Sequence, residues 1–295
     1  LTLVLLLGVE FAGVIKGGAK RWIEFGFFRI QPSEFIKIAL VLALARYFHR
    51  LNIEDISNPV TLIAPLALVG IPFALVLRQP DLGTALLILM GGGAVFFAAG
   101  VRLWKFALVV AIGATAVPVG WTFLHSYQKD RILTFLTPER DPLGAGYHIL
   151  QSKIALGSGG LFGRGFMEGT QSHLSFLPEK QTDFIFTMLA EEFGLAGGLG
   201  LLGLYTLLCL YGVAIALRSS NHFGRLIAIG VTFTFFLFVF INIAMVMGLL
   251  PVVGLPLPLI SYGGTAMLTV MAGFGLVICV YIHRDVRMGR SGEGR

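Results

Sequence analysis

The chain has 295 residues, of which 56% are hydrophobic and 13% are charged, and its formal net charge is +6. A soluble domain carries roughly a quarter charged residues, so this composition excludes an ordinary soluble protein and indicates a membrane protein. The two cysteines, Cys209 and Cys279, both lie inside apolar runs, which argues against a disulfide framework and a cysteine metal site.

Apolar runs recur along the chain at lengths that suit membrane-spanning helices, which need about 20 residues each. They fall at about 1–15, 35–48, 60–77, 82–99, 106–124, 194–217, 226–250 and 266–282. The 35–48 run is long enough only if its helix starts near Pro32, and the first run is short. The sequence therefore predicts an all-α polytopic membrane protein with eight transmembrane helices, forming a single membrane domain over residues 1–295. Because the chain begins with Leu inside an apolar run, we expect its native N-terminus to be missing.

One polar segment of about 58 residues, 126–183, interrupts this pattern. Membrane spans are usually joined by short loops, so a long segment rich in charged residues is the expected place for chemistry. Within it, Tyr147–Leu156 has helix-like apolar spacing but is too short to span a membrane. This stretch predicts a short amphipathic helix at the membrane interface.

The distribution of basic residues predicts an orientation. Counted over short loops, the side that carries the C-terminal tail has ten Lys and Arg residues, and the opposite side has five. Cytoplasmic loops are enriched in basic residues, so we expect a cytoplasmic tail and a large extracytoplasmic loop at 126–183. The basic residues placed on the outer side against this bias are Lys20, Arg21, Arg29, Arg131, Lys153, Arg164 and Lys180. They indicate either an anionic ligand, such as a lipid phosphate or pyrophosphate, or a solvated loop with scattered ion pairs.

Several common catalytic motifs are absent from the sequence. There is no Gly-x-x-x-x-Gly-Lys-Ser/Thr, Asp-x-Asp, His-Glu-x-x-His or Gly-x-Ser-x-Gly. Nucleotide-dependent motors, zinc proteases and serine hydrolases therefore lose support. An enzyme that uses a lipid-linked donor needs none of these motifs.

Asp183 is the strongest catalytic candidate, because it ends the long polar segment directly before an apolar run. Desolvation at an apolar boundary disfavours the charged form of a carboxylate, which makes it a better proton acceptor. The alternative is a helix N-cap, a role that Thr182 is also suited to take.

Two further polar groups lie at the ends of predicted spans. Glu34 and Lys37 are three residues apart and share one helix face. Ionisable residues in a span usually face the bundle interior or a cavity and mark function, and the alternative is a local ion pair at the membrane edge. Gln79 and Asp81 lie in a break between two spans, where Asp81 either caps the next helix or lines the same outer pocket.

Long motifs distributed almost end to end resemble the SEDS family (shape, elongation, division and sporulation), and within it the elongation branch. They are Gly18–Trp22, Gln31–Lys37, Gln79–Thr84, Tyr127–Arg131, Asp141–His148, Gln151–Ala155, Gly157–Leu161, Gly169–Ser172, Leu177–Phe186 and Pro256–Gly264. The resemblance implies a ten-span fold, of which this chain holds the third to the tenth span, and short helices within the large loop.

The resemblance also implies an activity. Members of the SEDS family are peptidoglycan glycosyltransferases that polymerise lipid II at the outer face of the cytoplasmic membrane, by inverting transfer with undecaprenyl pyrophosphate leaving. The essential loop aspartate of the family corresponds to Asp183. The implied partners are lipid II, membrane lipid and a cognate class B penicillin-binding protein, a transpeptidase; no nucleic acid is implied.

These considerations give two sets of candidate residues besides Asp183. The predicted substrate-binding residues are Lys20, Arg21, Trp22, Arg131, Lys153, Glu179 and Lys180. The predicted cavity or structural residues are Glu34, Lys37, Gln79, Asp81 and Ser261. A divalent cation, Mg²⁺ or Mn²⁺, is compatible with the chemistry, but no ligands are assigned to it. The alternative functions are a lipid II flippase, with Glu34, Lys37 and Asp81 along the path, and a non-catalytic scaffold for cell-wall synthesis.

Overall fold

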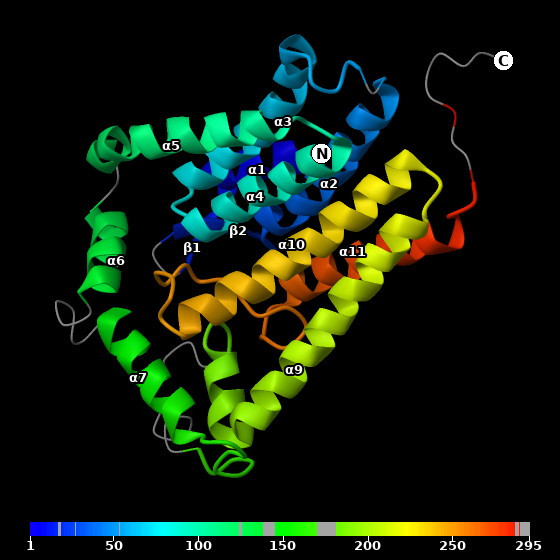
Figure 1. Ribbon diagram of the computed structural model, residues 1–295. Helices are drawn as coiled ribbons and strands as arrows, with labels where there is room; N and C mark the ends of the chain where they lie inside the picture. Colours follow the sequence, from blue (N-terminus) through cyan, green and yellow to red (C-terminus); the bar gives the residue numbers. More distant parts are fainter. Residues whose placement is uncertain are drawn as a thin grey trace. The chain divides into compact units, whose positions relative to one another are not determined.

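The computed structural model describes residues 1–16, 19–26, 28–52, 54–123, 126–137, 145–169, 181–286 and 289, and most of them form α-helices (Figure 1). The helices are α1 (Thr2–Ala12), α2 (Pro32–Arg50), α3 (Pro59–Arg78), α4 (Leu82–Ala99), α5 (Leu103–Phe123), α6 (Ser126–Leu136), α7 (Ala145–Ser158), α9 (Ile185–Arg218), α10 (His222–Val246) and α11 (Gly264–Ile282). Five of these, α3, α4, α9, α10 and α11, are long and apolar enough to cross a membrane. The chain is therefore a multi-pass membrane protein.

The helices follow the predicted apolar runs closely. Each of those runs overlaps a helix, and α2 begins at Pro32 as predicted, with the proline in the first turn, where its missing N–H costs nothing. The first helix, α1, has only 11 residues. The count of eight spans stays a prediction. Helix α7 confirms the short helix predicted around Tyr147–Leu156, and its place at an interface stays a prediction.

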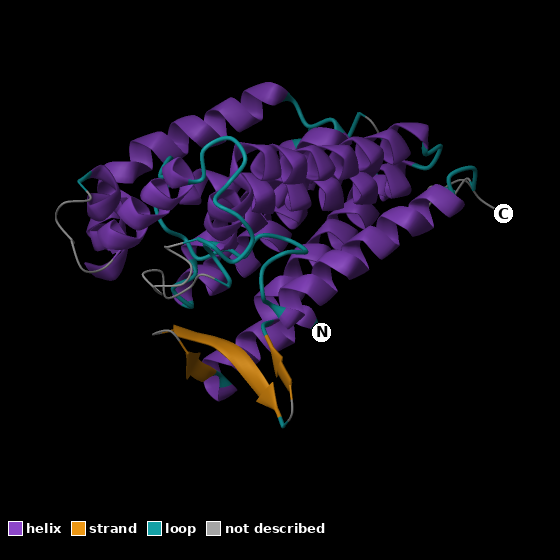
Figure 2. Ribbon diagram, turned by 90° about the horizontal axis from the view of Figure 1, so that it is seen from below, coloured by secondary structure: helices purple, strands orange, loops and turns teal. Residues whose placement is uncertain are grey.

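The prediction of an all-α fold missed a small antiparallel sheet in an otherwise mostly helical chain (Figure 2). Its strands are β1 (Val14–Lys16), β2 (Ala19–Phe25) and β3 (Phe28–Ile30), in the order β1-β2-β3. Arg29 Nε lies 2.5 Å from Glu24 Oε1 across the β2–β3 pair. Two of the strands have only three residues, which is too few for a sequence period to reveal.

The residues group into two compact units. Unit 1 comprises Leu1–Arg102, Leu208–Leu237 and Gly264–Arg295, and unit 2 comprises Leu103–Leu207 and Phe238–Gly263. Helices α9 and α10 each contribute to both units. The prediction of a single membrane domain stays a prediction.

Unit 1 is built around α2, which contacts α1, α3, α4 and α11. The core includes Phe48 of α2, whose ring meets that of Phe96 in α4 edge-on at a centroid distance of 5.1 Å. Gly230 of α10 allows this helix to pack closely against α2 and α4, because a Cβ at this position would lie 2.6 Å from Val41 of α2 and 2.9 Å from Val95 of α4. Small residues allow such close approach between membrane helices. The position of α2 fixes the polar residues of its first turn.

Unit 2 contains a break in α9 at Gly194, where φ is 68° and ψ is −163°. Such a break leaves helical N–H and C=O groups without their usual partners, which is costly inside a membrane. The segment 159–165 supplies replacements: Arg164 and Gly165 donate to the carbonyls of Glu191 and Glu192 at 3.0 and 3.1 Å, and Leu195 and Ala196 donate to those of Gly160 and Leu161 at 2.9 and 3.0 Å. The residues that follow Asp183 therefore form a short separate helical segment before the long one.

Candidate functional site

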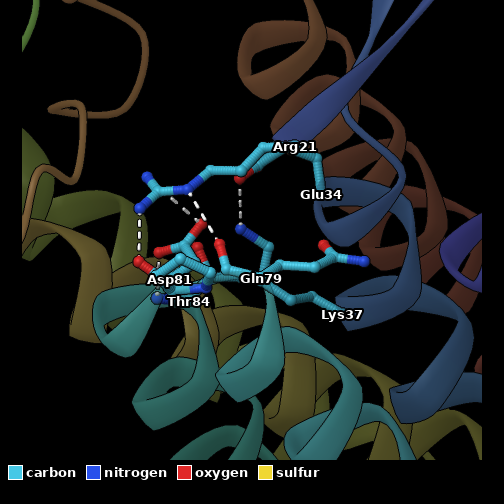
Figure 3. A network of polar contacts seen from close by, with 7 residues as sticks. Arg21, Glu34, Lys37, Gln79, Asp81 and Thr84 are labelled. Carbon is cyan, nitrogen blue, oxygen red and sulfur yellow. Dashed lines mark hydrogen bonds and ion pairs between the residues drawn. The ribbon is translucent and has the colours of Figure 1, made fainter. Parts of the chain in front are cut away.

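The predicted pair Glu34–Lys37 forms a buried ion pair in the first turns of α2. Lys37 Nζ lies 2.7 Å from Glu34 Oε1, and only 3% and 4% of the two side chains are exposed. The expectation that the two residues share a helix face is thus confirmed. Figure 3 shows the lysine ammonium pointing at the carboxylate. Glu34 Oε2 has no hydrogen-bond partner among the residues that the structure describes.

A second part of this network joins β2 to the α3–α4 break (Figure 3). Arg21 of β2 donates from Nε to the Gln79 carbonyl at 3.3 Å and from Nη2 to the Pro80 carbonyl. Its Nη1 lies 3.8 Å from Asp81 Oδ2. Asp81 also accepts from the Thr84 N–H at 3.2 Å, so it caps α4 as the alternative interpretation anticipated. The Arg21 guanidinium therefore ties β2 to the break between α3 and α4.

The charges of the network balance, and all of its charged side chains except the partly exposed Arg21 are buried. Arg21 and Lys37 contribute two positive charges, and Glu34 and Asp81 contribute two negative charges. Gln79 is 5% exposed and donates from Nε2 to the Leu6 carbonyl at 3.0 Å, which fixes α1 to the same break. The network therefore needs no outside ion to balance its charges, and a role in substrate binding or transport stays a prediction.

Asp183 lies in unit 2, half-buried, two residues before α9 begins. Its backbone carbonyl accepts a hydrogen bond from Asn242 Nδ2 at 2.9 Å, and the same amide group donates to the Leu255 carbonyl at 2.6 Å. Gly254 lies beside the carboxylate, because a Cβ there would be 3.3 Å from Asp183 Oδ2. A glycine with φ of +72° thus leaves space next to the proposed base.

Lys153 lies in α7 of the same unit, and its side chain is exposed. The neighbouring Ser152 is fully buried, and its Oγ is 2.9 Å from Thr187 Oγ1 and donates to the Val246 carbonyl at 2.8 Å. Thr187 is in the short helical segment that follows Asp183. The helix that carries Lys153 is therefore tied directly to the helix that follows Asp183.

The remaining predicted residues are distributed over both units. In unit 1, Lys20 Nζ donates to the Glu10 carbonyl at 3.4 Å, and the half-buried Trp22 pairs with Val14 across the sheet. In unit 2, Ser261 Oγ donates to the Thr182 carbonyl at 2.5 Å and accepts from the Leu257 N–H at 2.7 Å.

Three predicted residues cannot be placed in this way. The backbone of Arg131 lies in α6, but its side chain is outside the described part of the chain, as are Glu179 and Lys180 altogether. Within the described part, no group of three or more His, Cys, Asp or Glu side chains is arranged to hold a metal ion. The divalent cation stays a prediction without assigned ligands.

Sequence reasoning missed Asn242 and Gly254. Asn242 is a single amide side chain inside the apolar run 226–250, and a polar residue in a membrane span is a signal of packing or function. Gly254 gave no comparable signal, because its role depends on a positive φ and on a residue 71 positions earlier in the chain, Asp183.

These features define a polytopic helical membrane protein with a buried ion-pair network and a half-buried carboxylate at a loop–helix junction. The sequence profile of the FtsW/RodA/SpoVE family, described as "Cell cycle protein", matches residues 1–286. The chain belongs to this family, which confirms the resemblance drawn from its motifs.

Two proteins of similar sequence support the same family assignment. The peptidoglycan glycosyltransferase MrdB of Escherichia coli (strain K12) is 50% identical over 287 residues, which cover 96% of this chain and 76% of that protein. Stage V sporulation protein E of Bacillus subtilis (strain 168) is 38% identical over 280 residues, covering 95% of this chain and 75% of that protein.

Two solved structures share the fold. A chain from a structure titled "Structural coordination of polymerization and crosslinking by a peptidoglycan synthase complex" superposes with a TM-score of 0.81 at 34% identity, covering 96% of this chain and 79% of that one. The rod shape determining protein RodA of Thermus thermophilus superposes with a TM-score of 0.69 at 31% identity, covering 97% of this chain and 76% of that one.

Proposed function

We propose that this chain is a peptidoglycan glycosyltransferase that polymerises lipid II into glycan strands during cell elongation, with Asp183 as its general base. The observation that carries the proposal is the 50% identity, over 96% of the chain, to a relative named as a peptidoglycan glycosyltransferase. The half-buried carboxylate of Asp183, in a turn before a membrane helix, supplies a residue of the right chemistry.

The reaction is a glycosyl transfer with inversion. The 4-hydroxyl of the acceptor sugar attacks the anomeric carbon of the donor, and Asp183 takes the proton of that hydroxyl. The bond from the anomeric carbon to the pyrophosphate oxygen breaks, and undecaprenyl pyrophosphate leaves with the bonding electrons. A positioned base of this kind contributes about 10²- to 10⁴-fold to a rate.

The departing pyrophosphate needs cations, and Lys153 is the strongest candidate among the described side chains. It is exposed, and its helix is bonded through Ser152 to the helical segment that follows Asp183. Arg21 is a weaker candidate than the sequence suggested, because its guanidinium already contacts Asp81 and two carbonyl groups. Charge-assisted bonds to phosphate oxygens are strong enough to hold a leaving group in place.

The finer assignments complete the proposal. The enzyme would lie in the cytoplasmic (inner) membrane, with the site on the extracytoplasmic face and the C-terminus in the cytoplasm, as the basic residues of the short loops favour. A class B penicillin-binding protein would be its partner; the structural relative from a peptidoglycan synthase complex supports this pairing. No step of the mechanism is assigned to a metal ion.

The direct test is polymerisation of lipid II by purified protein, alone and with its class B penicillin-binding protein. Lipid II is supplied in detergent, where it needs no transport to reach the protein, and the glycan product is separated by length. We expect glycan polymer. In a second assay the protein is reconstituted into vesicles, and movement of lipid II across their membrane without polymer formation would indicate a flippase. A protein with neither activity would be a non-catalytic scaffold. A mock preparation from cells that do not express this chain, purified in parallel, controls for a contaminating enzyme.

A further inference from the structure

The turn that carries Asp183 is held through its backbone. Residues 181–184 form turns directly before α9, and hydrogen bonds from the first turn of that helix reach back to the Phe184 carbonyl. The three carbonyl groups before Phe184 accept hydrogen bonds from α10 and from the segment 251–263. The pairs are Tyr262 N–H to Gln181 at 2.9 Å, Ser261 Oγ to Thr182 at 2.5 Å, and Asn242 Nδ2 to Asp183 at 2.9 Å.

Asn242 is the central member of this set. It is fully buried in α10, and its one amide group donates both to the Asp183 carbonyl and, at 2.6 Å, to the Leu255 carbonyl. Leu255 follows Gly254, whose backbone lies beside Asp183 Oδ2. The amide therefore ties the backbone of Asp183 to the residue that follows this glycine.

This arrangement has a cost that packing alone does not explain. Both partners of the amide are carbonyl oxygens, which only accept, so Nδ2 must face them and Oδ1 must point away. Asn242 Oδ1 is buried and has no hydrogen-bond partner within the described residues. A buried acceptor without a partner is unfavourable, and such a group in a native structure calls for an explanation.

Ser261 makes a similar contact with Thr182, the residue before Asp183. Its hydroxyl donates to the Thr182 carbonyl and accepts from the Leu257 N–H at 2.7 Å, so it links the turn to the same 251–263 segment. A base must approach its proton donor to within about 2.6–3.2 Å, and a shift of about 1 Å can reduce a rate by about 10²-fold. Small movements of this turn would therefore affect catalysis before they affect folding.

We propose that Asn242 and Ser261 are positioning residues that fix the Asp183 carboxylate through the backbone carbonyls of Thr182 and Asp183. The inference rests on the proposed role of Asp183 as general base. Asn242→Ala should lower kcat for lipid II polymerisation by about 10- to 100-fold, because the base is displaced. KM should stay near the wild-type value, since neither side chain is assigned to lipid II.

The deciding experiment is a double-mutant cycle in the lipid II assay. Asn242→Ala, Asp183→Asn and the combined variant are purified, and their folding is checked by thermal unfolding in detergent. If Asn242 acts through Asp183, its loss has little further effect once the carboxylate is gone. Thr234→Ala is the matched control, since it removes a polar side chain of α10 whose hydroxyl bonds within its own helix at 2.8 Å.

The outcomes separate the inference from the proposed function. Losses that multiply in the combined variant, or a normal kcat for Asn242→Ala, overturn the positioning role while Asp183 keeps its own. Normal polymerisation by Asp183→Asn removes the general base and this inference together. If Asn242→Ala does not fold, Ser261 decides: Ser261→Ala should lower kcat, and Ser261→Thr, which keeps the hydroxyl, should restore it. Equal rates for Ser261→Ala and wild type would contradict the inference.

Discussion

The buried Glu34–Lys37 pair gives the most detailed prediction of stability. In Lys37→Met a carboxylate that is 4% exposed loses the ammonium 2.7 Å away, and in Glu34→Gln the ammonium loses the carboxylate. A stranded buried charge can always neutralise itself by a change of protonation. At pH 7 a glutamate in water needs about 3.7 kcal/mol to take up a proton, and a lysine needs about 4.6 kcal/mol to lose one. Both limits fall within the roughly 3–5 kcal/mol that breaking a buried pair costs.

The assay is thermal unfolding of purified protein in detergent at about pH 7, the pH at which these limits apply. The double variant Glu34→Gln with Lys37→Met leaves no stranded charge, so it should be more stable than Lys37→Met alone. A double variant less stable than Lys37→Met would refute the reasoning. If the double variant folds but does not polymerise lipid II, the pair also serves the site.

Further predictions concern single positions in unit 2. Lys153→Gln should weaken the apparent affinity for lipid II by about ten- to a hundredfold, because a charge-assisted bond worth about 1.5–3 kcal/mol is lost. Lys105→Gln, measured in the same titration of lipid II, should leave the affinity unchanged. Gly194→Ala should destabilise the fold by more than the roughly 1–3 kcal/mol of its backbone conformation, because a Cβ would also collide with the Gly163 backbone; Gly200→Ala, with open space around it, should be neutral or stabilising on thermal unfolding. Gly254→Ala should lower kcat, because its methyl group would crowd Asp183 Oδ2; a wild-type kcat in the lipid II assay would contradict that contact.

Local patterns accounted for the helices and for one ion pair. The helices of the eight apolar runs follow from hydropathy over about 20 residues, whereas α6 lies in the polar segment and has no such signal. Glu34 and Lys37 meet because a spacing of three places them on one face of α2. Asp81 could likewise be predicted as a cap, because its partner Thr84 is three residues away. Each of these features depends on neighbours within a few turns of the chain.

The rest of the candidate site depends on contacts between distant parts of the sequence. Arg21 reaches a carbonyl 58 residues away, and Asn242 reaches one 59 residues away. Neither partner has a spacing signature, because the fold alone brings the residues together. The break in α9 is similar: Gly194 marks the position, but the segment 159–165 that completes its hydrogen bonds comes earlier in the chain.

The central claim is that Asp183 is the general base of a lipid II polymerase, and the rate of polymerisation by Asp183→Asn tests it most directly. This change keeps the size of the side chain and an oxygen acceptor but removes the basic carboxylate. With equal amounts of folded, membrane-inserted protein, the rate should fall at least ~10²-fold, the usual scale for loss of a general base. Asp55→Asn, the same change at an exposed aspartate of unit 1, should polymerise lipid II at the wild-type rate. A rate for Asp183→Asn close to that of wild type would contradict the account.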